Sequence, residues 1–305
     1  MIPTRLRLFY HLTAFAVVAV WGSTFVFTKM LLMAGLSPAN IFTLRFIMAY
    51  VLLTCFEHLL SRQRGQPFQW TCGNWREELQ MIGLGLTGGS LYFLCENAAM
   101  LFTTATNTSL IVCSCPLFTM LAMVLVYRDE KIAGRQLAGS VIACVGMAIV
   151  VLNGHFVLHL SPTGDLLAFG ACVCWAAYSL IIKKAYSRYS TLFITRKVFF
   201  YGAVTILPYY LLVNDPLPME VVLRRDVLLN LLFLGCVASM LCFVIWNQAI
   251  SKLGAVETTN WVYFNPITTI IFARWILNEP ITPYFLIGAI LILSGMYMTT
   301  PKKLQ

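Results

Sequence analysis

The sequence predicts an all-α polytopic membrane protein, with ten transmembrane helices in two inverted repeats of five helices. Three observations lead to this fold class. The composition is too apolar for a soluble domain, the chain divides into ten hydrophobic segments, and residues of the first half recur in order in the second half. Such a chain is expected to work within a lipid bilayer.

The composition leaves too little polar surface to cover a water-soluble fold. Of 305 residues, 59% are apolar and 11% are charged, whereas soluble domains carry about 25% charged residues. The net charge of +9 comes from cations scattered in connecting segments, which favours a membrane topology signal over nucleic-acid binding. Most of the ten cysteines lie in apolar segments without the spacing of a zinc or redox motif, so we expect no metal.

Ten hydrophobic segments, each bounded by charges, proline or glycine, are long enough to cross a bilayer. They must be helices, because an open strand in lipid would leave its backbone groups without hydrogen bonds. The predicted spans are Leu12–Met33, Ala39–Leu60, Leu79–Ala99, Thr104–Val126, Leu137–Leu152, Asp165–Ala185, Leu192–Val213, Val227–Ala249, Ala255–Leu277 and Tyr284–Thr300.

The cations of the connecting segments predict that both termini are cytoplasmic. With the N-terminus inside, the external loops hold only Arg224 and Arg225. The cytoplasmic segments hold Arg5, Arg7, Arg62, Arg64, Arg76, Arg128, Lys131, Arg135, Arg188, Lys252, Lys302 and Lys303. This excess of positive charge on one side fixes the orientation of a multi-pass protein, which we expect in the cell (inner) membrane.

The second half of the chain repeats the first. Trp21 and Lys29 recur as Trp175 and Lys183, and Arg45 near the start of the second span recurs as Arg196. Four further residues recur at an offset of 150 positions: Gly85, Asn97, Ala105 and Pro116 as Gly235, Asn247, Ala255 and Pro266. Each repeat (residues 1–154 and 155–305) has an odd number of spans, so the second copy is inverted. Inverted repeats around a site at the bilayer midplane are typical of secondary transporters.

Short motifs in both halves resemble a known family. The opening Trp21-Gly22-Ser23-Thr24-Phe25 with Lys29, and later Asn265-Pro266 and Asn278-Glu279-Pro280-Ile281-Thr282, are similar to EamA-type proteins of the drug/metabolite transporter superfamily. The resemblance covers nearly the whole chain and implies ten helices, cytoplasmic termini and transport, often export, of amino acids or small metabolites. The linker from Tyr127 to Lys131 departs from it by one extra residue.

Aromatic and polar residues near the repeated positions are candidates for a substrate cavity. Aromatic rings could stack on an apolar substrate body, and amides and hydroxyls could bind its polar end, although helix packing is the alternative. The candidates are Trp21, Ser23, Thr24, Tyr92, Asn97, Asn107, Trp175, Tyr178, Trp246, Asn247, Gln248, Asn260 and Tyr263.

Four charged residues are candidates for gates. Charge within a bilayer is costly and marks function by default. Inversion puts Lys29 and Glu96 toward the exterior and Lys183 and Glu257 toward the cytoplasm. We expect one ion pair per face, Lys29 with Glu96 and Lys183 with Glu257, with snorkelling of the lysines to the interface as the alternative.

Proline and glycine predict where helices bend or pack closely. Pro116 and Pro266 lie inside spans and each removes a backbone hydrogen bond, so we expect paired kinks. Two glycine pairs lie seven residues apart, Gly139 with Gly146 and Gly288 with Gly295. One helix face free of side chains indicates close packing of the fifth and tenth spans.

The function that these features favour is secondary transport, in the direction of export, by alternating access. The substrate partner is a small amphipathic metabolite such as an amino acid. A polytopic enzyme acting on lipid and a channel are the alternatives. No cofactor is expected, although Glu96 or Glu257 could carry a coupled proton. Whether the protein is a monomer or a homodimer stays open.

Overall fold

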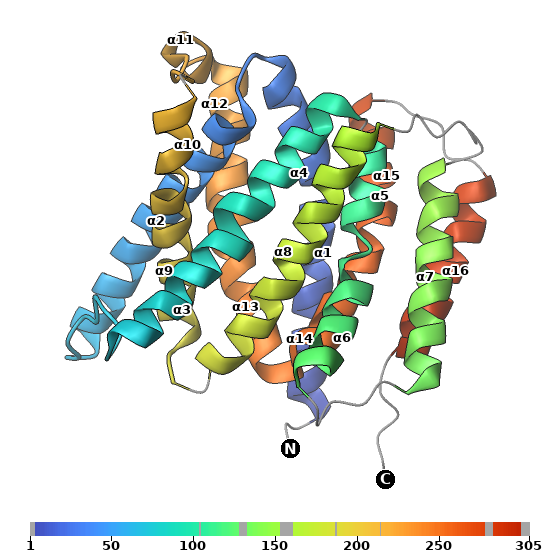
Figure 1. The fold of residues 1–305 in the computed structure, drawn as a ribbon, viewed down its shortest axis with the longest axis horizontal. Helices are drawn as coiled ribbons and strands as arrows, with labels where there is room; N and C mark the ends of the chain where they lie inside the picture. The colour runs from blue at the N-terminus through green and yellow to red at the C-terminus, as the bar shows by residue number, and fades with distance from the viewer. Residues whose placement is uncertain are drawn as a thin grey trace.

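In a computed structural model, the described residues form a bundle of helices that run up and down between two ends. These residues are 4–103, 105–127, 133–152, 161–186, 188–213, 215–277 and 283–299. Helix α1 (Thr4–Met33) begins and α16 (Pro283–Thr299) ends at the same end of the bundle (Figure 1). We call this the terminal end, and the end where α1 finishes the opposite end.

The first half of the chain contains long helices and several broken ones. Helix α2 (Pro38–Gln63) begins at Ser37, whose hydroxyl accepts a hydrogen bond from the Asn40 backbone N–H at 3.1 Å. The helices that follow in this half are α3 (Trp75–Gly85), the π-helical η1 (Leu86–Ser90), α4 (Leu91–Phe102), α5 (Ala105–Val112), α6 (Cys115–Val126) and α7 (Gly134–Leu152).

The second half also contains long and broken helices. Its helices are α8 (Pro162–Ala185), α9 (Thr191–Thr205), α10 (Leu207–Leu212), α11 (Met219–Val222), α12 (Arg225–Leu232), the π-helical η2 (Phe233–Leu241), α13 (Cys242–Leu253), α14 (Ala255–Thr259), the 3₁₀ helix η3 (Asn260–Phe264) and α15 (Asn265–Leu277). Gly254 ends α13 with a φ of 93°, a left-handed conformation that glycine adopts without steric cost.

Within the described residues, four continuous helical stretches are long and apolar enough to cross a membrane: Arg5–Met33, Pro38–Gln63, Pro162–Ala185 and Arg225–Leu253. Other predicted spans are interrupted. The segment predicted as Thr104–Val126 is divided into α5 and α6, and Pro116 lies in the first turn of α6. Pro266 is the second residue of α15, directly after the 3₁₀ helix η3. Since proline lacks a backbone donor, both breaks occur where the helical ladder cannot continue.

Helices α7 and α16 pack with their backbones in close contact. A side chain at Gly139 would lie 2.7 Å from the Gly295 carbonyl oxygen, and one at Gly146 would lie 2.8 Å from that of Gly288. The glycine spacing therefore predicted this contact correctly, because only glycine allows two helices to approach so closely.

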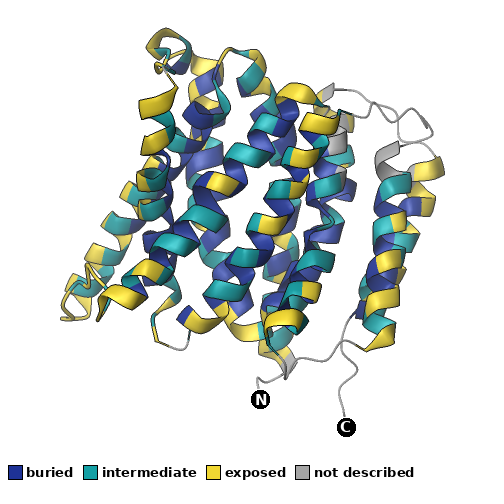
Figure 2. Ribbon diagram, viewed as in Figure 1, coloured by how far each residue is buried: buried dark blue, intermediate teal, exposed yellow. Residues whose placement is uncertain are grey.

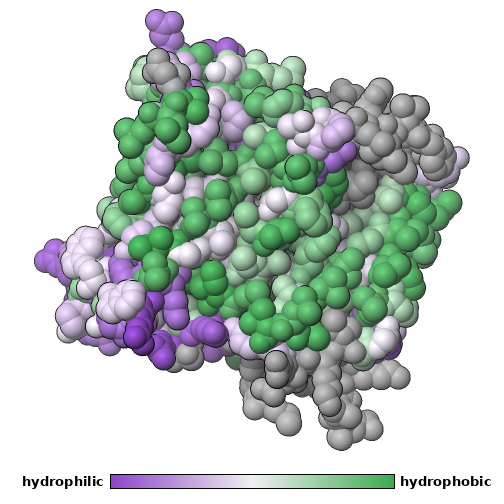
Figure 3. Space-filling model, viewed as in Figure 1, coloured by the Kyte–Doolittle hydropathy of each residue, from purple (hydrophilic) through white to green (hydrophobic). Residues whose placement is uncertain are grey.

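The outer surface of the bundle is apolar. Large side chains such as Leu125 (82% exposed), Leu212 (86%) and Trp275 (77%) lie on it. Buried residues line the facing sides of the helices (Figure 2), and hydrophobic residues cover much of the face in Figure 3, with hydrophilic residues gathered near the α2–α3 connection. A surface this apolar is stable against lipid rather than water.

Candidate functional site

A small cavity of about 40 Å³ lies in the middle of the bundle. Of the predicted substrate-cavity residues, Trp21, Thr24, Tyr92 and Trp175 lie in its wall. The rest of the wall is Phe25, Arg45, Phe93, Glu96, Val112, Cys115, Phe243, Val262 and Asn265. The rings pack on one another, with the centroids of Trp21 and Trp175 5.9 Å apart in an edge-to-face arrangement. The cavity therefore combines an aromatic wall with two charges.

The two charged side chains of this cavity are almost fully buried. Arg45 is 3% exposed and Glu96 is 9% exposed. Glu96 Oε1 accepts a hydrogen bond from the Tyr92 hydroxyl at 2.9 Å. Arg45 Nε donates to Ser239 Oγ at 3.2 Å, and its guanidinium lies 4.8 Å from the centre of the Phe93 ring.

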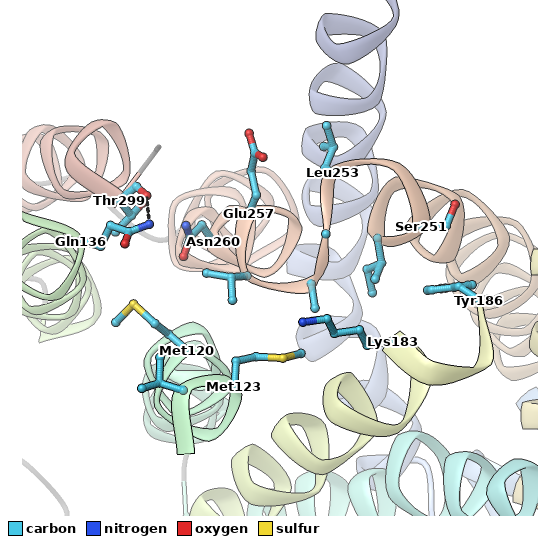
Figure 4. A pocket seen from close by; sticks show the side chains of 15 residues that line it. Met120, Met123, Gln136, Lys183, Tyr186, Ser251, Leu253, Glu257, Asn260 and Thr299 are labelled. Atoms are coloured by element: carbon cyan, nitrogen blue, oxygen red, sulfur yellow. Dashed lines mark hydrogen bonds between the residues drawn. The ribbon is translucent and has the colours of Figure 1, made fainter. Parts of the chain in front are cut away.

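A second, larger cavity of about 370 Å³ lies at the terminal end. Its wall includes Lys183, Ser251 and Gly254, which are exposed, so this cavity opens to the surface. Figure 4 shows the side chains around it, contributed by the ends of α6, α8, α13 and α14 and by α7 and α16. The predicted cavity residue Asn260 lies in this wall, and Val262, two residues further along the chain, lines the central cavity.

Buried aromatic residues occupy the level between the two cavities. On α8, Tyr178 lies between Trp175, which lines the central cavity, and Lys183, which lines the larger one. On α13, Trp246 holds the corresponding place. Tyr178 and Trp246 are each 0% exposed. We call these two residues the aromatic layer. Tyr263, also 0% exposed, follows Val262 of the central cavity in η3 and is not part of this layer.

A hydrogen-bond network holds Tyr178 of the aromatic layer in place. The Tyr178 hydroxyl donates to Asn247 Oδ1 at 2.8 Å, and Asn247 Nδ2 donates to Thr195 Oγ1 at 2.8 Å. This network joins α8, α13 and α9, so the predicted residues Tyr178 and Asn247 hold the layer in place rather than line a cavity.

The charged pairs at the two ends differ from those predicted. Glu257 pairs with Arg7 at 2.6 Å and with His11 Nε2 at 3.1 Å, both on α1, and its carboxylate points away from Lys183 (Figure 4). Lys183 Nζ lies over the Tyr127 ring at 4.1 Å. The cause is geometric, because Arg7 and His11 lie one helical turn apart on α1 and both reach the Glu257 carboxylate.

The predicted pair of Lys29 with Glu96 is also replaced. Lys29 Nζ donates to the Met100 carbonyl oxygen near the end of α4 at 2.9 Å, whereas Glu96 faces the central cavity one turn deeper. Further hydrogen bonds join separate segments of the chain at this opposite end: Asn97 Nδ2 to the Pro38 carbonyl at 3.2 Å, Ser37 Oγ to Asp215 Oδ2 at 2.5 Å and Asn230 Nδ2 to the Phe27 carbonyl at 3.0 Å.

At the terminal end, on the side away from the larger cavity, ion pairs join α2 and α3 to α9. Arg196, 2% exposed, pairs with Glu57 at 2.7 Å. Glu78 accepts hydrogen bonds from Lys197 and Tyr201. Although partial burial acts against it, these bonds lower the pKa of Glu78 to about 2. We call Glu57, Glu78, Arg196 and Lys197 the ionic clamp.

Comparison with known proteins identifies the chain. A model described as the EamA-like transporter family matches residues 8–152 and 162–300. The chain belongs to the EamA-like transporter family. It is therefore a membrane transporter and not an enzyme, and its substrates are small molecules.

Relatives of this EamA-like transporter have matching lengths. A protein named "Uncharacterized transporter" from Archaeoglobus fulgidus is 28% identical over 97% of this chain and 98% of its own. A protein of Escherichia coli named "Probable amino-acid metabolite efflux pump" is 24% identical over 93% of this chain and 92% of its own. A solved crystal structure shares the fold, with a TM-score of 0.75 and 18% identity over 95% of this chain and 97% of that one.

Besides Asn247, Tyr263 and the aromatic layer, three predicted cavity residues of this EamA-like transporter line neither cavity, and the side chain of a fourth is undescribed. The hydroxyl of Ser23 donates to the Val20 carbonyl on its own helix at 2.6 Å. Asn97 joins α4 to the start of α2, and Gln248 is exposed on α13. The side chain of Asn107 falls outside the described residues.

Arg45, Phe243 and Asn265 line the central cavity but were absent from the predicted set. A signal for Arg45 was present, since it is a charge inside a predicted span that recurs as Arg196. The repeat mates have different partners, however: Arg45 lies in the cavity, whereas Arg196 belongs to the ionic clamp.

Proposed function

We propose that this transporter is a secondary exporter of small amphipathic metabolites, such as amino acids, in the cell membrane, and that it works by alternating access. The observation that carries the proposal is the order of the two cavities and the aromatic layer along the bundle axis. A cavity of about 370 Å³ opens at one end, a central cavity of about 40 Å³ lies deeper, and an aromatic layer separates them. A carrier needs such a site, reached from one side at a time.

The proposed topology has ten transmembrane helices, formed by two inverted repeats of five. The family model matches each half of the chain separately, and the proline breaks before α6 and α15 fall at repeat-related positions. The positive charge of the segments on the side of the termini supports a cytoplasmic terminal end. The structure then corresponds to an inward-open conformation. A reporter fused after Gln305 should be cytoplasmic, and one inserted within Asn214–Asp226 should be external.

The names of two relatives support the choice of substrate and direction. One is the "Probable amino-acid metabolite efflux pump" of Escherichia coli. The other, from Streptantibioticus cattleyicolor, is named "Probable terminal-alkyne amino-acid exporter" and is 26% identical over 74% of this chain and 75% of its own. The aromatic wall of the central cavity suits the apolar body of such a solute.

The energy source is proposed to be either the substrate gradient or a coupled proton. Glu96, in the central cavity, and Glu257, in the wall of the larger one, are the acids that could carry that proton. Uptake into proteoliposomes with and without an imposed pH gradient separates the two. A rate that is unchanged by the gradient excludes proton coupling.

Reconstitution into liposomes tests the function itself. Vesicles loaded with a small-molecule extract of cells should release specific metabolites faster than protein-free vesicles, as measured by mass spectrometry. Release should saturate with concentration, and an outside pool of the same compound should accelerate labelled exchange. Fast release without saturation or counterflow would indicate a channel, and no selective release would contradict the proposal.

A further inference from the structure

The central cavity holds one cation and one anion that are not paired with each other. Arg45 and Glu96 both line it, and both are more than nine-tenths buried. Each acts electrostatically on the other, yet among the described residues no ion pair within 4.0 Å joins them. Burying separated charges is costly unless something compensates both.

The protein itself compensates these charges only in part. Glu96 has a hydrogen bond from Tyr92, and Arg45 uses Nε to bind Ser239. In the described part of the chain, the two terminal nitrogens of Arg45 make no hydrogen bond. A guanidinium presents these nitrogens as a fork that fits a carboxylate with two parallel hydrogen bonds.

Two further polar groups in the same wall lack partners. Trp175 Nε1 is a buried donor and Asn265 Oδ1 a buried acceptor, and neither has a hydrogen bond. Buried polar groups are normally paired. The wall therefore offers unused donors and an unused acceptor around a space bounded by opposite charges.

We infer that Arg45 and Glu96 bind the two ends of a zwitterion, the α-carboxylate at Arg45 and the α-ammonium at Glu96, with the substrate side chain against Trp21 and Trp175. The inference rests on the proposed transport function and narrows its substrate to compounds that carry both charges. A bound amine without a carboxylate would leave Arg45 buried without a counter-ion. A bound carboxylic acid without an amino group would leave Glu96 buried without one. Such a site rejects both.

The present volume of this cavity requires the wall to move when substrate binds. About 40 Å³ holds a few water molecules and not a whole amino acid. The aromatic layer is the barrier between this space and the larger cavity. Displacement of Tyr178 and Trp246 would join the two spaces and let the substrate reach the charges from the terminal end.

The test uses the intact protein in proteoliposomes loaded with the twenty proteinogenic L-amino acids. We expect selective release of at least one. The amine that decarboxylation of that amino acid gives, and the acid that lacks its amino group, should each compete at least about 30-fold more weakly than the amino acid. Release of amines or acids from a metabolite extract, without any amino acid, would overturn the inference and leave the transport function standing. No selective release of any compound would instead contradict the transport function.

Two variants assign the charges separately. Arg45→Gln should weaken binding of the amino acid at least tenfold, and the amine should then compete as well as the amino acid. Glu96→Gln should weaken binding of the amino acid by a similar factor, and the acid without an amino group should then compete as well as the amino acid. Arg224→Gln changes an exposed arginine and serves as the matched control, and thermal stability and monodispersity establish folding of each variant. Unchanged selectivity in folded Arg45→Gln and Glu96→Gln would overturn the inference.

Discussion

The two ends of the bundle differ in the contacts that a lysine makes at each of them. At the opposite end, Lys29 of α1 donates to the Met100 carbonyl of α4 at 2.9 Å. The proposed repeat relates Lys29 to Lys183 of α8, and Met100, at an offset of 150 positions, to Ile250 of α13. Both of these residues line the 370 Å³ cavity at the terminal end. The Ile250 carbonyl accepts instead from the Gly254 backbone N–H at 2.8 Å.

This difference shows what closing an end requires. A lysine near the end of one helix reaches a carbonyl on the neighbouring helix and draws the two together. At the terminal end the corresponding carbonyl, of Ile250, binds the Gly254 backbone N–H instead, and a cavity separates α8 from α13. If the halves are inverted repeats, the outward-open state would exchange these arrangements, with Lys183 at the Ile250 carbonyl and Lys29 released.

Removing the contact at the closed end should have the largest effect. A hydrogen bond from a charged donor contributes about 1.5–3 kcal/mol, and Lys29→Met removes it from the inward-open state alone. We expect the ratio of outward-open to inward-open protein to rise about 10- to 150-fold. Spin labels on Lys184→Cys and Ser251→Cys, in an otherwise cysteine-free protein, would report this as a shorter distance across the terminal end.

Two variants sharpen that measurement. Lys183→Met should act in the opposite direction and lengthen the average distance. Arg224→Gln, at the same end as Lys29, removes an arginine paired with Asp226 while both are more than half exposed, so it should change nothing. A distance distribution that stays the same in Lys29→Met would show that this lysine does not close the opposite end.

The ionic clamp lies at the terminal end, and we expect it to keep its position when the protein changes between the inward-open and outward-open states. The pKa of Glu78 is lowered from 4.5 to about 2 by its bonds to Lys197 and Tyr201. The stability from this group is therefore present above about pH 4.5 and is lost as the pH falls toward 2. We expect Glu78→Gln to lower the free energy of unfolding by about 2 kcal/mol at pH 7.

Thermal unfolding in detergent from pH 7 to 2 measures this contribution. The melting temperature of wild type should fall below pH 4.5 more steeply than that of Glu78→Gln. Parallel curves for the two proteins would mean that Glu78 carries no such stability. The spin-label distance in Glu78→Gln should match wild type, because the clamp lies on the other side of the end from the cavity.

Sequence patterns predicted well what depends on local chemistry. The breaks near Pro116 and Pro266 and the close approach at Gly139 follow from what these residues do to a helix, wherever it lies. The charged partners depend on which turns of distant helices meet, and in a transporter also on the conformation. The pairing of Glu257 with Arg7 joins residues 250 positions apart, and no periodicity indicates it.

The pairing of Glu257 reverses the expected effect of changing it. A pair with Lys183 would close the terminal end, so its loss would favour the inward-open state. In the structure Glu257 is paired with Arg7 and His11 while that end is open, so Glu257→Gln should favour the outward-open state. Arg7 is 31% exposed, which limits the effect to about 1 kcal/mol, or about fivefold. A longer spin-label distance in Glu257→Gln would instead support the predicted pair of Glu257 with Lys183 as the contact that closes the terminal end.

The smallest effect is expected at Gln248, which the sequence placed beside Asn247 in the substrate cavity. Neighbouring residues on a helix point about 100° apart, so when Asn247 faces inward and binds Tyr178, Gln248 must face outward, where it is exposed. Gln248→Ala should leave transport within about twofold of wild type, since exposed substitutions change little. Asn247→Ala, in contrast, removes two buried hydrogen bonds and should impair transport clearly. Equal losses of transport activity in the two variants would show that the outer face of α13 also contributes to transport. The residues that distinguish the two ends of the bundle would then have to be sought on its outer surface as well as on its inner one.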